Sequence, residues 1–415
     1  MSDTNQLADD ATRLPRYDRA QSYEWNYEHA PRLPGDVDDR AAGLSGDRDP
    51  HPAFGHLLPK GEGFLEPFSP GEKVAAQPTD EGQVGPTLGS AINIPSIPGE
   101  WNFCGLPVTS PLGIAAGPLL NGRWLRYYAE LGFDVLTYKT VRSIERACFP
   151  MPNLVPVTQE VMTGDERSVT AADVMHGSWA VSFGMPSKGP SVWRTDVEET
   201  RKRLPRGKVL VVSVVASEQP GWKLDDLADD YARCAKWAVE SGADVVETNF
   251  SCPNVCSTDG QLYQTPADAA LCAARVREAI GGTPYVVKIG HIRDAAEAEA
   301  LVEALSSSID GLAMTNSVAA PVVDGAGNSL FDGKPRGICG AAVLEPSLKQ
   351  TRMIRQVVNQ RYLHGGVKPP FLIGVGGAFT AEDAHRYLVA GAQAVHLATA
   401  VMVDPTVALR IRREW

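Results

Sequence analysis

The segment 247–255, with the sequence ETNFSCPNV, combines two carboxamides, a thiol and a proline that fixes a turn. Asn249 and Asn254 offer hydrogen-bond donors and acceptors together, which suits a planar ligand bearing amide or imide groups. Cys252 has a thiol whose ordinary pKa of about 8.5 would let it act as a general base beside cations. An isolated cysteine is otherwise common buried filler. Asn316 and Ser317, which follow another apolar run, extend the set of polar side chains.

Two lysines, Lys139 and Lys288, each come at the end of an apolar run. Burying an unpaired ammonium is costly, so lysines in such places suggest an anionic partner. For a flavin, a cation near N1 and O2 of the ring would stabilise the reduced, anionic form. The alternative is that each lysine reaches out to solvent.

Small residues follow three other apolar runs. Gly376-Gly377 and Ala398-Thr399 would leave backbone N–H groups free to hold a phosphate. Ala115, Ala116 and Gly117 would let a flat ring system lie against the backbone. Small residues at these places also serve tight packing without any ligand, so both interpretations stay open.

Short apolar runs alternate with amphipathic, alanine-rich stretches from about residue 101, a pattern typical of parallel sheets with helices between the strands. The helical pattern is clearest at Leu224–Ser241 and Ala267–Ile280. Eight strand–helix units in about 300 residues predict a (βα)8 barrel, with long insertions at 140–208 and 318–369. A doubly wound open sheet is the competing architecture, but no G-x-G-x-x-G opens a first unit. The eight predicted strands are Leu112–Ala116, Asp134–Tyr138, Val209–Val215, Asp244–Asn249, Tyr285–Ile289, Gly311–Thr315, Phe371–Val375 and Ala394–Ala398.

Residues 1–100 form a different kind of chain from residues 101–415. They hold 17 acidic and 8 basic side chains, whereas the remaining 315 residues hold 33 and 31. They are rich in Pro, Gly and Asp and show no sustained period, so we predict a long irregular extension ahead of the barrel. Three aromatics, Tyr23, Trp25 and Tyr27, are too apolar to stay in water. They favour a segment docked on the barrel, or an arm that binds a partner or covers the active site.

The composition narrows the function classes. A formal charge of −11 argues against nucleic acid or an anionic membrane as the main partner. No secretory leader or run of 18 apolar residues occurs, which predicts a cytoplasmic protein. The seven cysteines form no C-x-x-C pair and no His pair has zinc-finger spacing, so we expect reduced thiols, no metal site and no iron–sulfur cluster.

The motif NFSCPNV resembles the Asn-x-Ser-Cys-Pro-Asn segment of the dihydroorotate dehydrogenases, in the cytosolic class that uses a cysteine base. Further segments resemble the family in the same order: GIAAGP, TYKTV, VVKIG, AMTNS, IGVGG and HLATAV. The resemblance implies a (βα)8 barrel that binds one FMN non-covalently, with Cys252 taking a proton from one substrate carbon while hydride leaves the adjacent carbon for flavin N5. It assigns substrate binding to Lys139, Asn249, Asn254, Asn316 and Ser317, and FMN binding to Ala115, Ala116, Gly117, Lys139, Thr140, Asn249, Lys288, Gly340, Gly376, Gly377, Ala398 and Thr399.

Two departures from the family bear on the substrate. Val181 stands where the family commonly has an orotate-binding Asn, and a site built around a hydrogen bond loses heavily when one partner is apolar. Cys339 stands where the family usually has Gly near the flavin. We therefore predict an FMN-dependent oxidoreductase acting on a pyrimidine-like ring, with a small-molecule substrate, a homo-oligomeric state and room for a redox partner subunit. The alternatives are a related flavoenzyme for another planar amide or enone, and a non-catalytic barrel that holds a partner through its N-terminal arm.

Overall fold

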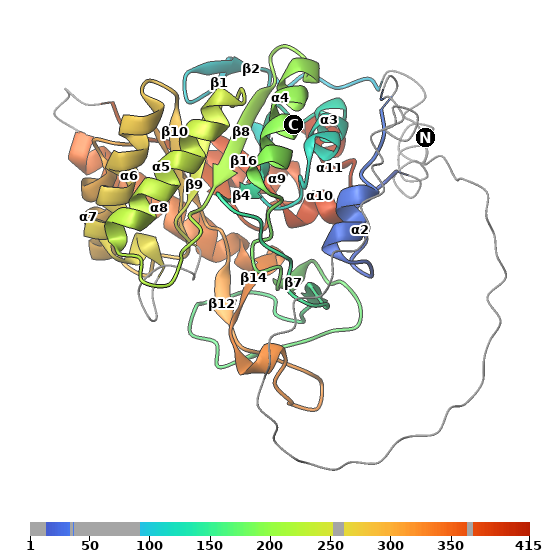
Figure 1. Cartoon of the computed structure of the whole chain (residues 1–415). Helices are drawn as coiled ribbons and strands as arrows, with labels where there is room; N and C mark the ends of the chain where they lie inside the picture. Colours follow the sequence, from blue (N-terminus) through green and yellow to red (C-terminus); the bar gives the residue numbers. More distant parts are fainter. Residues whose placement is uncertain (1–13, 34–35, 37–91, 252–260, 363–367) are drawn as a thin grey trace, which may run out of the picture.

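A closed barrel of eight parallel strands forms the centre of the protein. The computed structural model describes residues 14–33, 36, 92–251, 261–362 and 368–415. The barrel consists of β3 (Leu112–Ile114), β4 (Val135–Val141), β8 (Val209–Val214), β9 (Val245–Asn249), β10 (Tyr285–Lys288), β11 (Gly311–Met314), β15 (Phe371–Val375) and β16 (Ala394–Leu397). These strands follow one another around the barrel in chain order, and β16 pairs with β3 to close it. The predicted (βα)8 fold is confirmed (Figure 1).

Alternation of side chains along each strand separates an inner from an outer core. In β9, Val245 belongs to the apolar cluster inside the barrel, whereas Val246 belongs to the larger cluster under the helices. The surrounding helices are α3 (Gly122–Glu130), α4 (Pro190–Arg203), α5 (Leu224–Glu240), α6 (Pro266–Ile280), α7 (Ala295–Leu305), α8 (Leu344–Tyr362), α9 (Ala381–Val389), α10 (Thr399–Val403) and α11 (Val407–Arg413). The two helices predicted from the pattern correspond to α5 and α6, and each differs by one residue at one end.

The amino-terminal end of the barrel is closed by a hairpin of β1 (Trp101–Phe103) and β2 (Leu106–Val108), which lies at the top of Figure 1. Phe103 is fully buried and its ring lies 5.5 Å from that of Phe371 and 5.4 Å from that of His396. Since this end is filled with aromatic rings, ligands must approach from the carboxyl ends of the strands, as in other barrels of this type.

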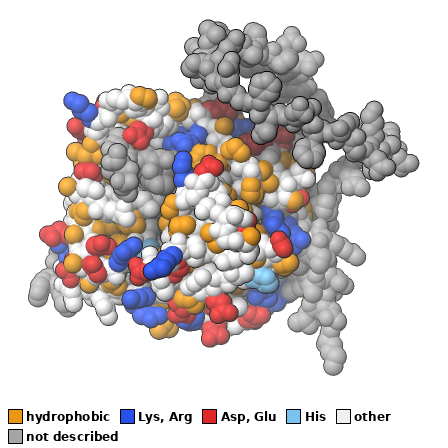
Figure 2. Space-filling view, turned by 90° about the horizontal axis from the view of Figure 1, so that it is seen from below, with side chains coloured by type: hydrophobic (Ala, Val, Ile, Leu, Met, Phe, Trp, Pro, Cys, Tyr) orange, Lys and Arg blue, Asp and Glu red, His pale blue; other side chains and the backbone are white. Residues whose placement is uncertain are grey.

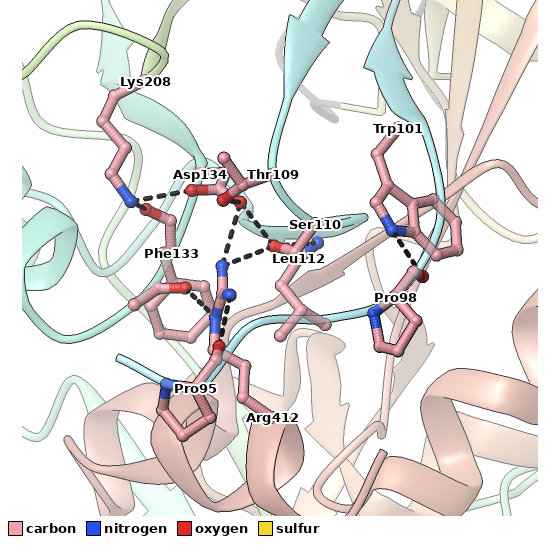
Figure 3. Close-up of polar contacts among 11 residues, drawn as sticks. Pro95, Pro98, Trp101, Thr109, Ser110, Leu112, Phe133, Asp134, Lys208 and Arg412 are labelled. Atoms are coloured by element: carbon pink, nitrogen blue, oxygen red, sulfur yellow. Dashed lines mark hydrogen bonds and ion pairs between the residues drawn. The ribbon is translucent and has the colours of Figure 1, made fainter. Parts of the chain in front are cut away.

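A buried ion pair ties the C-terminal helix to the amino-terminal ends of the first strands (Figure 3). The guanidinium of Arg412 lies 2.9 Å from the carboxylate of Asp134, and both side chains are almost completely buried. Asp134 also accepts hydrogen bonds from the hydroxyls of Thr109 and Ser110 and pairs with Lys208 at 2.7 Å. The pairing satisfies a charge that would otherwise be costly inside the protein.

The two predicted insertions form one antiparallel sheet at the other end of the barrel, at the bottom of Figure 1. Its strand order is β12 (Val318–Ala320), β14 (Arg336–Gly340), β7 (Ser178–Val181) and β5 (Leu154–Pro156). Beside it β6 (Val169–Thr170) pairs with β13 (Val322–Val323), and the 3-10 helices are η1 (Leu262–Gln264), η2 (Phe331–Gly333) and η3 (Ala341–Val343). Seen from this side, charged side chains of both signs are interspersed with hydrophobic ones (Figure 2).

The aromatic residues of the N-terminal extension dock on the barrel, as the first of the two interpretations of this segment predicts. Residues 23–28 form helix α2 (Tyr23–Glu28), whose N-cap is Ser22. Asn121 Nδ2 donates to the carbonyl of Tyr27 at 2.7 Å, and Trp124 Nε1 donates to that of Asn26 at 3.1 Å. None of the helices in the described ranges is both long and apolar enough to cross a membrane.

Candidate active site

Lys288 ends β10 inside the barrel, one strand away from Asn249. Val286 of the same strand belongs to the inner cluster, so alternation turns Lys288 inward as well. Its ammonium lies 3.4 Å from the carboxylate of Glu247, and the two side chains are 3% and 2% exposed. The alternative that this lysine reaches out to solvent is excluded, because its side chain is buried.

His396 adds a third titratable group to the barrel interior and is neutral there. Burial lowers its pKa to about 3, and the nearby charge of Lys288 acts in the same direction. Its imidazole lies against β3 at Gly113, where a Cβ would come within 2.5 Å of Nε2. A neutral histidine leaves Glu247 to balance the charge of Lys288, so these two groups determine the charge at this side of the site.

Lys139 and Thr140 lie near the end of β4 and are both buried. The Thr140 hydroxyl shares a hydrogen bond of 3.0 Å with that of Ser213 on the neighbouring strand β8. The pairing of β4 with β8 is irregular between Tyr138 and Val141, so the alternation that places Val135 inside the barrel does not by itself fix the direction of Lys139. Both predicted lysines are therefore buried near the carboxyl ends of their strands, and alternation places Lys288 on the inside of the barrel.

Asn249 ends β9 and is held by its neighbours. Its Oδ1 accepts hydrogen bonds from the backbone N–H and the hydroxyl of Ser251, at 3.2 and 2.7 Å. Its Nδ2 lies 3.5 Å from the sulfur of Met185, which comes from the insertion after β7. These contacts fix the rotamer of a carboxamide at the mouth of the barrel. Cys252 and Asn254, three and five residues further on, lie outside the described residues.

Asn316 and Ser317 follow β11, where the insertion sheet meets the barrel. The thiol of Cys339 in β14 lies 3.7 Å from the carbonyl oxygen of Asn316. Burial raises the pKa of this thiol to about 12, despite the opposing effect of Lys288, so Cys339 stays protonated at neutral pH. Val181 is half-buried in β7, pairs with Gly337 of β14, and packs against the main apolar cluster.

Two glycines at the end of β15 form a close backbone approach. Gly376 and Gly377 have φ of 122° and 74°, values that favour glycine. A Cβ on Gly377 would lie 2.6 Å from the backbone nitrogen of Leu344, and one on Gly376 would lie 2.6 Å from Ser347 Oγ. Gly340, with φ of 101°, packs on the carbonyl of Gly177. These glycines let the backbone after β15 pack closely on the start of α8, and a barrel that also buries two lysines near the carboxyl ends of β4 and β10 fits a phosphate-bearing planar cofactor such as FMN.

The small residues predicted to lie beside a ring system, Ala115, Ala116 and Gly117, come directly after β3. The backbone N–H of Ala115 continues the ladder to Leu397 of β16 at 3.0 Å, and Ala398 and Thr399 follow that strand. A Cβ on Gly117 would meet nothing within 4 Å, so backbone packing does not require a glycine there. The barrel geometry thus gathers the described predicted residues at the carboxyl ends of seven strands, apart from Gly340, which ends β14 of the insertion sheet.

Three residues near the site were not identified from the sequence. Glu247 and His396 lie within the motifs ETNFSCPNV and HLATAV but have no predicted role there, and Met185 lies in neither motif. The first two could have been found by counting two residues along each strand from an inward-facing neighbour. Met185 carries no such signal, because its contact with Asn249 depends on how an irregular segment folds back over the barrel.

Buried lysines together with the positive-φ glycines Gly376 and Gly377 at the carboxyl end of the barrel are typical of the class of flavin-binding (βα)8 oxidoreductases. The family model described as dihydroorotate dehydrogenase matches residues 100–415. The chain therefore belongs to the dihydroorotate dehydrogenase family. It is 29% identical to the dihydroorotate dehydrogenase of Dictyostelium discoideum, over 74% of this chain and 86% of that protein. It is 25% identical to the catalytic subunit of dihydroorotate dehydrogenase B (NAD(+)) of Methanocaldococcus jannaschii, over 72% and 86%.

Membership confirms three predictions made from the sequence. The protein is an enzyme, an oxidoreductase acting on CH–CH groups, and not a barrel kept only to hold a partner. Its cofactor is FMN, as in the rest of the family. Its reaction partner is a small molecule.

Proposed function

We propose that this protein oxidises dihydroorotate to orotate. The observation that carries this proposal is the pair of buried lysines, Lys139 near the carboxyl end of β4 and Lys288 at that of β10, where Lys288 pairs with Asn249. Dihydroorotate carries imide and amide groups in its ring together with a carboxylate, so it needs both a cation and carboxamide partners. The names of the relatives support the same substrate.

The proposed binding roles follow the predicted residues. Lys139, Asn249, Asn254, Asn316 and Ser317 would hold the ring of the substrate. Lys288 would lie by the flavin ring, and the backbone at Gly376, Gly377, Ala398 and Thr399 would hold the phosphate. The small residues Ala115, Ala116 and Gly117, together with Thr140 and Gly340, would complete the walls.

Chemistry in the proposed reaction is divided between cofactor and protein. When bound, FMN supplies the acceptor for the hydride that leaves the substrate. Cys252 would take the proton from the adjacent carbon, and Lys139 and Asn249 would orient the ring for that transfer.

We further propose how the enzyme is organised. Residues 101–415 would form the catalytic barrel and residues 1–100 an extension of it, in a cytoplasmic homo-oligomer. Reduced flavin would pass its electrons to a redox partner subunit, an arrangement supported by the relatives named as catalytic subunits.

Val181 favours a second candidate, in which a related flavoenzyme oxidises another planar amide or enone. An apolar side chain in β7 cannot donate a hydrogen bond to a substrate carboxylate. Dihydrouracil, which has the same ring without the carboxylate, separates the two candidates. Faster flavin reduction by dihydrouracil than by dihydroorotate would favour the second.

The test of the base is Cys252→Ala, with Cys256→Ala from the same segment as the matched control. Loss of a general base typically slows a reaction by about 10²–10⁴-fold. The Cys252 variant should still bind FMN but reduce it slowly with dihydroorotate, whereas the Cys256 variant should behave as wild type. Equal rates in both variants would refute the assignment of Cys252.

A further inference from the structure

The N-terminal strap, residues 14–33, packs two tyrosine rings against Phe183. The ring of Tyr17 meets that of Phe183 edge to face, with centroids 6.0 Å apart, and the ring of Tyr23 does so at 6.2 Å. Tyr17 is 7% exposed and Tyr23 4%. Aromatic pairs in this geometry are favourable beyond the area that they bury, so the strap and Phe183 hold each other in place.

Phe183 belongs to the segment that reaches Asn249. Two residues on, Met185 has φ of 55°, and its sulfur lies 3.5 Å from Asn249 Nδ2. The carbonyl of Met185 accepts a hydrogen bond from Arg142 Nε at 3.1 Å, and the backbone N–H of Phe149 donates to the carbonyl of Phe183 at 3.0 Å. A movement of Phe183 would therefore move the sulfur that contacts Asn249.

The strap also closes the side of the site at Lys139. Tyr23 and Tyr27 line a small cavity together with Lys139, Thr140 and, among others, Pro186. Its volume is about 10 Å³, which holds about one water molecule. The tyrosines thus leave almost no free space beside the two predicted ligand-binding residues of β4.

Anchors on helix α3 keep the strap in this position. Tyr127 Oη donates to the carbonyl of Pro15 at 2.8 Å, and Arg123 donates to that of Glu28 at 2.7 Å. With the bonds from Asn121 and Trp124 described above, α3 holds the strap near both of its ends. A segment attached at several points along a rigid helix can position a neighbouring loop.

We propose that the strap is a positioning element of the active site, in which Tyr17 and Tyr23 hold Phe183 and thereby set Met185 against Asn249. This inference rests on the proposed function, since Asn249 and Lys139 are the ligand-binding residues of that function. It explains why the strap packs its tyrosine rings on the segment after β7.

The test compares Tyr17→Ala with Trp25→Ala in the full-length protein. Trp25 lies on the same strap, is 37% exposed, and stacks on His29 instead of Phe183. Loosening one ligand-orienting hydrogen bond should raise the Kd for FMN or the KM for dihydroorotate about 3- to 10-fold in the Tyr17 variant, with kcat nearly unchanged. The Trp25 variant should match wild type. Equal constants in the two variants would overturn the proposal.

Two further variants distinguish a loss of positioning by the strap from a general loss of folding. Tyr17→Phe keeps the ring and removes a hydroxyl that is buried without a hydrogen-bond partner in the described part of the chain, so its constants should equal those of wild type. Tyr17→Leu keeps apolar volume but loses the ring contact, and it should show the same rise as Tyr17→Ala; wild-type constants would count against the proposal. The FMN arm tests the strap even if dihydroorotate proves not to be the substrate, because it needs no substrate.

Discussion

The buried pair of Arg412 and Asp134 provides a quantitative test of what holds the barrel closed (Figure 3). Arg412→Met removes the cation and keeps most of the apolar volume of the side chain. The guanidinium also donates to the carbonyls of Gly132 and Pro95, at 2.7 and 2.9 Å. These acceptors lose their partner with it, so the substitution disconnects α11 from the start of β4 and from the segment before β1.

The size of the effect depends on which charge is left behind. Removing one partner of a buried ion pair typically costs about 3–5 kcal/mol. After Arg412→Met, Asp134 keeps Lys208 at 2.7 Å, so we expect a loss near the lower end, about 3 kcal/mol. Asp134→Asn leaves Arg412 and Lys208 without their carboxylate, and we expect about 5 kcal/mol.

Urea unfolding monitored by circular dichroism measures the difference, with Arg194→Met as the control. Arg194 pairs with Glu240 at 3.0 Å, but these side chains are 36% and 44% exposed, and such pairs contribute less than about 1 kcal/mol. The predicted order of destabilisation is Asp134→Asn, then Arg412→Met, then Arg194→Met. Buried variants no less stable than the control would refute the reasoning.

The same pair predicts a pH dependence. Burial alone would raise the pKa of Asp134, but Lys208, Ser110 and Arg412 outweigh it and hold the pKa below its usual 3.8. The stabilisation is therefore present above pH 3.8 and is lost as the pH falls through the lower, folded-state pKa. The gap between wild type and Asp134→Asn should be constant from pH 5 to 8; a gap that closes within this range would contradict the sign.

Three other predictions concern the site. Gly377→Ala places a Cβ 2.6 Å from the backbone of Leu344 at φ of 74°, so FMN affinity should fall on the order of tenfold, measured by flavin fluorescence. Glu247→Gln leaves Lys288 without its counter-charge, which should raise the midpoint potential of bound FMN by on the order of 30 mV, measured by redox titration. His396 has a pKa of about 3 in the folded protein, so below pH 6.5 its imidazole is protonated in the unfolded chain but not in the folded one. The free energy of unfolding should therefore fall by up to about 1.4 kcal/mol for each pH unit below 6.5. His396→Asn should lessen this dependence of the unfolding free energy on pH.

Each of these has a result that would contradict it. Gly325→Ala, at a position where a Cβ would meet no atom within 4 Å, should leave FMN affinity unchanged. An equal loss of affinity in this variant would show that the loss in Gly377→Ala does not come from the close approach of Gly377 to Leu344. A potential that stays the same or falls in Glu247→Gln would show that the carboxylate does not balance Lys288. An unchanged acid slope in His396→Asn would show that this imidazole is not the group that titrates.

The barrel was predictable from the sequence because its signals are local. Each buried strand is a short apolar run, and helix ends carry glycines such as Gly242 and Gly391, with φ of 98° and 102°. Parallel strands end at the same edge, so residues such as Lys139, Lys288 and Gly377 could be assigned to one mouth before any coordinates were known.

The covering of that mouth was not predictable, because its contacts are non-local. The insertion sheet pairs β7 with β14, so that Trp179 faces Cys339 across 160 residues of sequence. Tyr17 and Phe183 likewise meet only because α3 positions the strap. Apolar periodicity says which face of an element is buried, but not which irregular segment covers it.

Anaerobic titration of the purified protein with dihydroorotate tests the central claim most directly. We expect a yellow protein whose flavin absorbance bleaches in proportion to added dihydroorotate, with one orotate formed for each flavin reduced. A flavin that dithionite bleaches but dihydroorotate does not would contradict the claim.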